Sequence, residues 1–296
     1  MADQVAQESL RGQFFDKVIK QTAKRAYKFK QAVSIVSTGA WRNFFYRETT
    51  DVLTGATGNL TKGIPRGAEF PQASGSWDRI ETIIEKYGLE DNIPWEDLVS
   101  DEIDVRDRTL IKIAEGVTKA VDDEIWAVLS DSGNALANKV VQTIDVGGDS
   151  MASKFWDVAS AAIIDDLLQA KQLIAEENYD VGNLMAFVSP KDYRSINNYL
   201  AGKGAQFPQL GDSVAANGDA GKLVGIKFVI SNSVTASQAI VVVPKRCATW
   251  KELVALSTTT KEDPYKSLTI RSVEMGVTQL TDPKSVVFIS GTQKPA

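Results

Sequence analysis

Histidine is absent from the 296-residue chain, and cysteine occurs once, as Cys247. The chain therefore cannot build a Ser-His-Asp or Cys-His catalytic group, a His-ligated metal, a zinc cluster or an intrachain disulfide. Histidine is also the commonest general base near neutral pH. The absence of histidine makes an enzyme less expected, although carboxylate or lysine chemistry stays possible. We expect no catalytic residue, no cofactor and no metal site.

Long apolar runs are also missing. None approaches the roughly 18–20 residues that a helix needs to cross a bilayer, so we expect no membrane span. Hydrophobic residues make up 43% of the chain and charged residues 24%, which is typical of a globular protein in water. The length allows one large domain or two ordinary ones with a buried core.

Charge is unevenly distributed along the chain. Residues 1–30 contain seven basic and three acidic side chains, a net charge of +4, and because the whole chain carries −5 the remainder carries −9. A basic N-terminal segment on an acidic body can dock on another copy of the chain or face a polyanion. The alternative is that these basic residues only form the solvated face of a helix.

A polar stretch with five glycines, residues 47–75, separates two β-prone segments at 41–46 and 77–87. This arrangement predicts a long, open β-hairpin. An isolated two-stranded ribbon buries little surface and is only marginally stable in water. The hairpin must therefore lie on its own body or pair with a neighbour, unless the stretch is a disordered loop.

Helical periodicity is clearest from about Asp101 to Leu129, where apolar residues recur every three or four positions. At 1.5 Å per residue, this helix is expected to be roughly 40 Å long. Further helices are predicted at 9–30, 153–177 and 190–200, strands at 183–189, 224–230, 239–243, 267–277 and 285–289, and a polar surface loop at 201–221. Because helices and strands mix without regular βαβ alternation, the fold class is α+β.

Three motifs and the order of these elements carry a family resemblance. The motifs are Ile-Pro-Trp-Glu-Asp-Leu-Val-Ser-Asp-Glu-Ile-Asp-Val at 93–105, Phe-Val-Ser-Pro-Lys-Asp-Tyr at 187–193 and Gly-Ile-Lys-Phe-Val-Ile-Ser at 225–231. Over nearly its whole length, the chain resembles the major capsid proteins of tailed viruses of the Hong Kong 97 type, which have the same fold as encapsulins. The motifs are loose, since this family shares shape more than sequence.

The resemblance implies four parts: an N-terminal arm (1–38), an extended β-hairpin loop (39–90), a peripheral domain with the long spine helix (91–150 and 249–296) and an axial domain (151–248). In this family the extended loop lies across the neighbouring subunit's peripheral domain, and the axial domain lines the capsomer centre. The expected inter-subunit contacts are Phe14, Lys17, Val18, Arg47, Lys62, Arg66, Trp77 and Arg79. The expected capsomer-centre residues are Lys203, Gln206, Asp212 and Asn217.

The implied function is that of a major capsid protein, not an enzyme. It forms pentamers and hexamers of an icosahedral shell that encloses double-stranded DNA without sequence-specific binding. The protein is expected in the virion, after assembly in the host cytoplasm. Because the arm helix starts so close to Met1, the resemblance implies a separate scaffolding protein or none. A portal and a decoration protein are the other expected partners. Lys62 stands in a suitable loop for covalent crosslinking, but no residue identifies the matching asparagine or catalytic glutamate.

Two other functions stay open on the sequence. The first is the shell of an encapsulin-type nanocompartment, which has the same fold. The second is a carboxylate-dependent enzyme or a ligand-binding α+β protein with residues 47–75 folded over a pocket. Adjacent acids such as Asp122-Asp123 and Asp165-Asp166 are plentiful, yet neighbours on a helix point about 100° apart and do not face each other.

Overall fold

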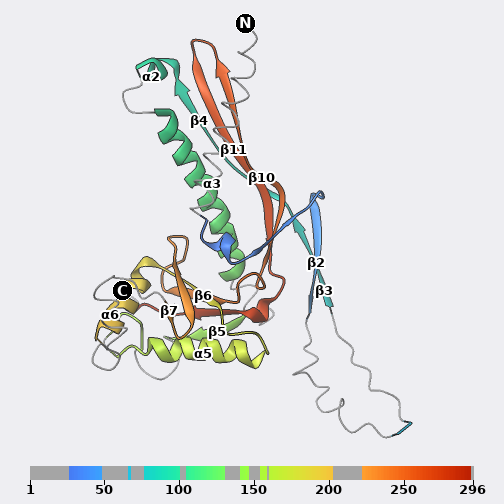
Figure 1. Ribbon diagram of the computed structural model, residues 1–296, viewed down its shortest axis with the longest axis vertical. Coiled ribbons are helices and arrows are strands. Elements are labelled where there is room, and N and C mark those ends of the chain that lie inside the picture. The colour runs from blue at the N-terminus through green and yellow to red at the C-terminus, as the bar shows by residue number, and fades with distance from the viewer. Residues whose placement is uncertain are drawn as a thin grey trace.

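The computed structural model describes residues 27–48, 66–67, 77–100, 105–130, 141–146, 154–158, 160–202 and 222–294. The helix predicted at 9–30 and the polar loop predicted at 201–221 lie almost entirely outside this part of the chain. The described elements form an elongated lobe, built on long strands and one long helix, and a second lobe at its base (Figure 1). The fold class is α+β, as predicted.

The elongated lobe, here called the blade, combines a four-stranded sheet with a long helix. Its strand order is β1-β10-β11-β4. The elements span Ser34–Ser37 (β1), Glu85–Pro94 (β4), Thr249–Asp263 (β10), Ser267–Gln279 (β11), Trp95–Ser100 (α2) and Val105–Ser130 (α3). β10, β11 and β4 are antiparallel to one another, and β1 adds in parallel to the start of β10.

Helix α3 covers one face of this sheet because its apolar positions form a stripe. Ile113, Val117 and Val121 follow one another at helical spacing and are fully buried. Gly116 allows β4 to approach the helix closely, since a Cβ at this position would lie 2.8 Å from Cδ2 of Leu89. The long helix predicted from sequence is therefore present, and it forms the rigid spine of the blade.

The second lobe is built on a six-stranded sheet with the order β5-β12-β9-β6-β8-β7. The elements span Gln142–Asp145 (β5), Ile163–Glu176 (α5), Leu184–Val188 (β6), Pro190–Gly202 (α6), Lys222–Leu223 (β7), Ile226–Ile230 (β8), Gln238–Val242 (β9) and Val286–Ser290 (β12). Helix α5 covers one face of the sheet. On the other face, Phe187 and Ile240 share a core with Trp126 of α3, so the two lobes pack on each other.

The second predicted helix begins later than its sequence suggests. Helix α5 starts at Ile163 rather than at 153, and the described residues just before it form turns. The cause is tertiary: buried Trp156 donates its indole N–H to Asp166 (2.8 Å) and its backbone N–H to the carbonyl of Thr292 (2.8 Å). These two bonds hold the segment against the sheet and away from helical geometry.

Two long strands of the blade also differ from the prediction. The sequence pattern gives no strand at 249–263, where the structure has the 15-residue strand β10. The β-prone segment predicted at 77–87 is divided between two sheets: β3 ends at Ile83, and β4 begins at Glu85 and continues to Pro94. Residues 90–92 are Glu, Asp and Asn, which are uncommon in strands, but the pairing of β4 with β11 holds them extended.

Candidate assembly surfaces

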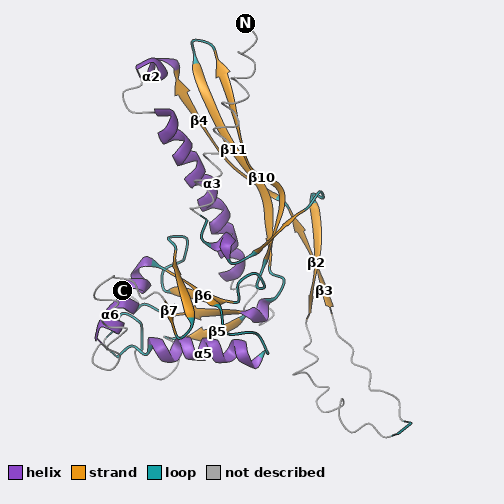
Figure 2. Ribbon diagram, viewed as in Figure 1, coloured by secondary structure: helices purple, strands orange, loops and turns teal. Residues whose placement is uncertain are grey.

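A two-stranded hairpin stands apart from both larger sheets. Strands β2 (Arg42–Glu48) and β3 (Trp77–Ile83) pair antiparallel over their full length. They extend from the side of the blade (Figure 2). Among the described residues, neither strand pairs with a third one. This confirms the open hairpin predicted from the two β-prone segments.

The two faces of this hairpin differ in burial because side chains alternate along a strand. One face is partly covered by the subunit itself: Arg47 is only 6% exposed, and Gln279 donates a hydrogen bond to the Thr82 hydroxyl (2.7 Å). The other face, here called the hairpin face, points into solvent. It consists of Arg42, Phe44, Tyr46, Arg79, Glu81 and Ile83.

The hairpin face has the composition of a protein–protein contact. Phe44 is 46% exposed and Tyr46 61% exposed. The guanidinium of Arg79 lies over the Phe44 ring, 3.9 Å from its centre, and Arg42 forms an ion pair with Glu81 (3.4 Å). Exposed ion pairs contribute little to folding, whereas exposed aromatic residues and arginine are typical of interface hot spots.

A second exposed apolar group, here called the blade tip, lies at the end of the blade farthest from the second lobe (Figure 1). The rings of Trp95 and Tyr265 meet edge to face with centres 5.8 Å apart. Tyr265 is 82% exposed, and Val99 on α2 is 66% exposed. The Trp95 backbone N–H donates to the carbonyl of Lys266 (3.0 Å), which fixes α2 against the β10–β11 turn.

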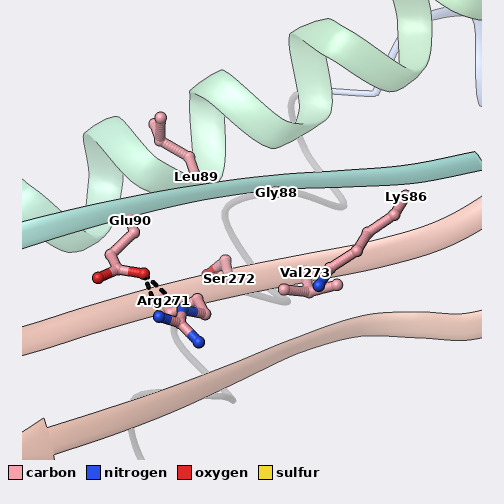
Figure 3. A pocket seen from close by; sticks show the side chains of 7 residues that line it. All are labelled: Lys86, Gly88, Leu89, Glu90, Arg271, Ser272 and Val273. Carbon is pink, nitrogen blue, oxygen red and sulfur yellow. Dashed lines mark hydrogen bonds and ion pairs between the residues drawn. The ribbon is translucent and has the colours of Figure 1, made fainter.

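The face of the blade sheet opposite α3 contains an open hollow of about 340 Å³ (Figure 3). Its lining includes Lys86 and Glu90 of β4, Val273 of β11 and the backbone of Gly88, which has no side chain to fill the space. The Glu90 carboxylate accepts hydrogen bonds from the Arg271 guanidinium. The hollow is shallow and open to solvent, which suits a docking side chain better than an enclosed substrate.

Two buried carboxylates, Asp192 and Glu274, have hydrogen-bond partners within their own chain. Asp192 is fully buried and accepts hydrogen bonds from Ser189 (2.7 Å), Thr292 (3.0 Å) and Gln293 (3.0 Å). Glu274 accepts from Lys30 (2.5 Å) in the blade core. Each carboxylate is hydrogen-bonded by groups of its own chain, as is usual for a buried structural carboxylate.

Two further properties concern the described part of the chain as a whole. No group of three or more Cys, Asp or Glu side chains within it is placed to hold a metal ion. Of its helices, none combines the length and the apolar character that crossing a membrane requires.

The buried carboxyl group of Asp122 makes the stability of the blade core depend on pH. Burial raises its pKa from 3.8 to about 6, although the backbone N–H groups of Lys28, Lys30 and Phe29 oppose the shift. Because the folded pKa lies above the unfolded one, the fold is less stable above pH 6, where Asp122 is ionised, than near pH 4, where Asp122 is protonated. At 1.36 kcal/mol per pKa unit, this difference is on the order of 3 kcal/mol.

Asp122→Asn is expected to remove this pH dependence. The free energy of unfolding of the wild type minus that of the variant should rise as the pH falls from about 7 to about 4.5. Denaturant titrations of both proteins at each pH give this difference, in which the shared effects of all other carboxyl groups cancel. A difference that stays flat or falls on acidification contradicts the raised pKa.

The predicted contact residues are only partly described. Phe14, Lys17, Val18, Lys62, Lys203, Gln206, Asp212 and Asn217 lie outside the described residues, as does the side chain of Trp77. Arg66 and Arg79 are exposed, whereas Arg47 is buried within its own subunit. All twelve stay predictions.

The sequence analysis did not name the exposed apolar residues of the hairpin face and the blade tip as contacts, namely Phe44, Tyr46, Ile83, Val99 and Tyr265. The shared face of Phe44 and Tyr46 could have been predicted, because residues two positions apart on a strand point to the same side. No comparable pattern marks Val99 or Tyr265. Their exposure depends on how α2 and the β10–β11 turn meet in space.

Comparison with known proteins identified one matching family and several solved structures of similar fold. A family model described as "Phage capsid protein" matches residues 79–289, and a search of curated proteins found no match. The capsid of cyanophage P-SCSP1u is 13% identical with a TM-score of 0.67, and 90% of each chain is covered. The virus-like particle from Pyrococcus furiosus is 10% identical with a TM-score of 0.59, covering 93% of this chain and 98% of that one. The mature capsid of bacteriophage PhiM1 is 17% identical with a TM-score of 0.59, covering 91% and 88%.

Proposed function

Since this chain belongs to the phage capsid protein family and is a major capsid protein with the Hong Kong 97-type fold, we propose that it assembles into pentamers and hexamers of an icosahedral shell enclosing double-stranded DNA. The finer organisation proposed is an arm (1–38), an extended loop (39–90), a peripheral domain (91–150 and 249–296) and an axial domain (151–248) at the capsomer centre. The protein acts in the virion, after assembly in the host cytoplasm.

The hairpin face is the observation that carries this proposal. A two-stranded ribbon is only marginally stable alone, yet this one turns its aromatic face to solvent. Covering the exposed part of Phe44 or Tyr46 is worth on the order of 2 kcal/mol for each ring. Repeated in every subunit of a closed shell, such modest contacts become cooperative. The ribbon therefore gains most of its stabilisation from a neighbouring copy.

The hollow on the blade sheet is the proposed seat for the neighbouring hairpin. It lies on the face that α3 leaves uncovered, and its open space of about 340 Å³ can receive a side chain from another subunit. Its rim carries the charges of Lys86, Glu90 and Arg271, and the hairpin face carries both signs as well. An aromatic ring in the hollow, surrounded by polar contacts, gives the usual anatomy of a protein interface.

The proposed partners follow from the shell function. A separate scaffolding protein guides assembly, a portal occupies one vertex, and a decoration protein binds the finished surface. DNA is enclosed without sequence-specific contacts, since the chain outside residues 1–30 carries a net charge of −9 and a strong phosphate-binding surface requires clustered lysine and arginine.

Sedimentation and electron microscopy of the purified chain test this function. Closed shells, or rings of five or six subunits, support it. A uniform species of one to four copies, both alone and when co-expressed with the neighbouring structural genes, contradicts it. The contents of the particles separate the two kinds of shell: DNA supports a virus capsid, whereas an enclosed enzyme supports an encapsulin-type compartment.

The blade tip yields a separate prediction. Tyr265→Ala combined with Val99→Ser is expected to lower subunit stability by only about 1 kcal/mol, because both side chains are exposed and the edge-to-face contact of Tyr265 with Trp95 is lost. The yield of closed particles should fall, and smaller oligomers should accumulate, because contacts between adjacent capsomers are weakened. Sedimentation profiles at equal concentration measure the change. An unchanged profile removes the blade tip from the set of contact surfaces.

A further inference from the structure

Residues Tyr27–Val33, here called the buried segment, lie where the two lobes meet. Phe29 has no exposed surface. Its ring stacks on Phe187 of the second lobe with centres 4.3 Å apart, and lies 5.6 Å from Trp126 of α3. The segment thus packs into the core that the blade and the second lobe share, although it belongs to neither sheet.

A carboxylate on the spine helix holds the main chain of this segment. Asp122, which is 4% exposed, accepts the backbone N–H groups of Lys28 (2.7 Å), Phe29 (3.2 Å) and Lys30 (3.4 Å). These are the donors at the start of a short 3₁₀ turn, Phe29–Gln31, which have no partner within the turn. The position of the backbone is therefore set by Asp122 and not by side-chain packing alone.

A second buried carboxylate holds the side chains of the segment. Glu274 on β11 has no exposed surface; it accepts a hydrogen bond from the Tyr27 hydroxyl and forms an ion pair with Lys30 (2.5 Å). The Lys30 ammonium also lies over the ring of Trp250, 5.5 Å from its centre. Burial of such charges costs free energy unless both are paired, so a buried pair selects one arrangement more than it stabilises the fold.

The segment fixes the chain on both of its sides. Upstream lie residues 1–26, the first part of the proposed arm (1–38). Downstream, Lys245 donates its backbone N–H to the carbonyl of Ala32 (2.5 Å), Ser34 donates to the carbonyl of Lys245 (2.7 Å), and β1 pairs with β10. The hairpin begins only five residues after β1 ends, at Arg42. One small cluster therefore determines where both extensions leave the subunit.

We propose that Asp122, Glu274 and Lys30 are positioning residues for assembly. They hold the buried segment in a single place and so set the exit of the arm and the origin of the hairpin, the two parts proposed to reach neighbouring subunits. Local opening of a segment requires less free energy than unfolding of the whole chain. Loss of this anchor therefore leaves a folded subunit whose extensions are wrongly directed. The effect on shells rests on the proposed function; the anchoring itself does not.

Trypsin cleavage of isolated subunits tests the anchor. Asp122→Asn places an amide donor against backbone N–H donors, Glu274→Gln removes the charge that pairs with Lys30, and Tyr27→Phe removes one hydroxyl without altering shape. Cleavage after Lys28 and Lys30, identified by fragment mass, should become faster by roughly tenfold or more in the first two variants. Tyr27→Phe, the mildest change, keeps the test valid if another variant fails to fold. Glu177→Gln, which breaks the partly exposed pair with Lys284 in the second lobe, is the matched control and should leave cleavage unchanged.

Electron microscopy of particles from the same variants tests the positioning role. Variants with an opened segment and a normal unfolding temperature should give malformed particles or a broad range of sizes. Unchanged protection of Lys28 and Lys30 in every folded variant overturns the anchor. Faster cleavage together with uniform, wild-type particles overturns the positioning role. If the wild type forms no particles at all, the proposed function fails, while the cleavage comparison still decides the anchor.

Discussion

Replacement of Phe44 and Tyr46 by glutamate is expected to give a folded subunit that no longer forms fast-sedimenting particles. Both rings lie on the hairpin face and are about half exposed in the subunit, so their loss leaves the subunit core intact. In the shell, each glutamate would replace an apolar ring by a charge that loses its water on assembly, which is unfavourable. Together with about 2 kcal/mol of lost apolar contact per ring, the expected fall in particle yield is at least roughly 100-fold.

Leu168→Glu provides the matched control for this experiment. Leu168 lies on α5 of the second lobe and is 46% exposed, the same fraction as Phe44. The control tests whether any exposed apolar-to-acidic change prevents assembly. Sedimentation velocity separates particles from subunits, and circular dichroism confirms folding. Normal particles from the double hairpin variant would show that the hairpin face is not a subunit contact.

The hairpin could be predicted from the sequence because the patterns that indicate it lie within short stretches of the chain. Alternating apolar residues mark each strand, and the polar, glycine-containing stretch between them marks the connection. The same local signals identify helix α3, whose stripe includes Ile113, Val117 and Val121. Strand β6 and the start of helix α6 at Pro190 also follow from short-range patterns. Which face of the hairpin is covered depends on Gln279, far along the chain.

Strand β10 could not be predicted from alternation of apolar and polar residues. Its residues are partly exposed along most of their length, and register shifts interrupt its pairing with β11 between Glu252 and Ser257. Each shift changes which side chains face α3, so no clean alternation remains in the sequence. The strand exists because β11 and β1 pair with it from either side.

The buried anchor could not be predicted for a different reason. Tyr27 and Glu274 are 247 positions apart, and Lys28 and Asp122 are 94 apart. In the sequence, Lys28 and Lys30 are two of seven basic residues in a polar N-terminal segment, and Glu274 is one acid in a strand pattern. Only the fold turns Lys30 and Glu274 into a buried pair. A charged residue that looks solvated in sequence thus becomes part of the core.

Gly276→Ala is expected to be the most destabilising single-methyl substitution among the described glycines. A Cβ at this position of β11 would lie 2.4 Å from Cζ2 of Trp250 and 2.9 Å from the carbonyl oxygen of Lys251. Trp250 is fully buried, so its ring cannot move away without displacing its neighbours. Overpacking of a core typically costs 1–3 kcal/mol, and with backbone crowding added we expect about 3 kcal/mol or more.

The substitution also tests how tightly the blade core is connected to the anchor. Lys30 lies over the Trp250 ring, so displacement of that ring should expose Lys30 and accelerate trypsin cleavage at this residue. Thermal unfolding should shift downward by roughly 6–12 °C, whereas Gly39→Ala, with no atom within 4 Å of the added Cβ, should shift it very little. Equal unfolding temperatures for the two variants would mean that the core around Trp250 yields to the added methyl group. Lower stability with unchanged cleavage would mean that Glu274 and Asp122 hold the buried segment without help from Trp250.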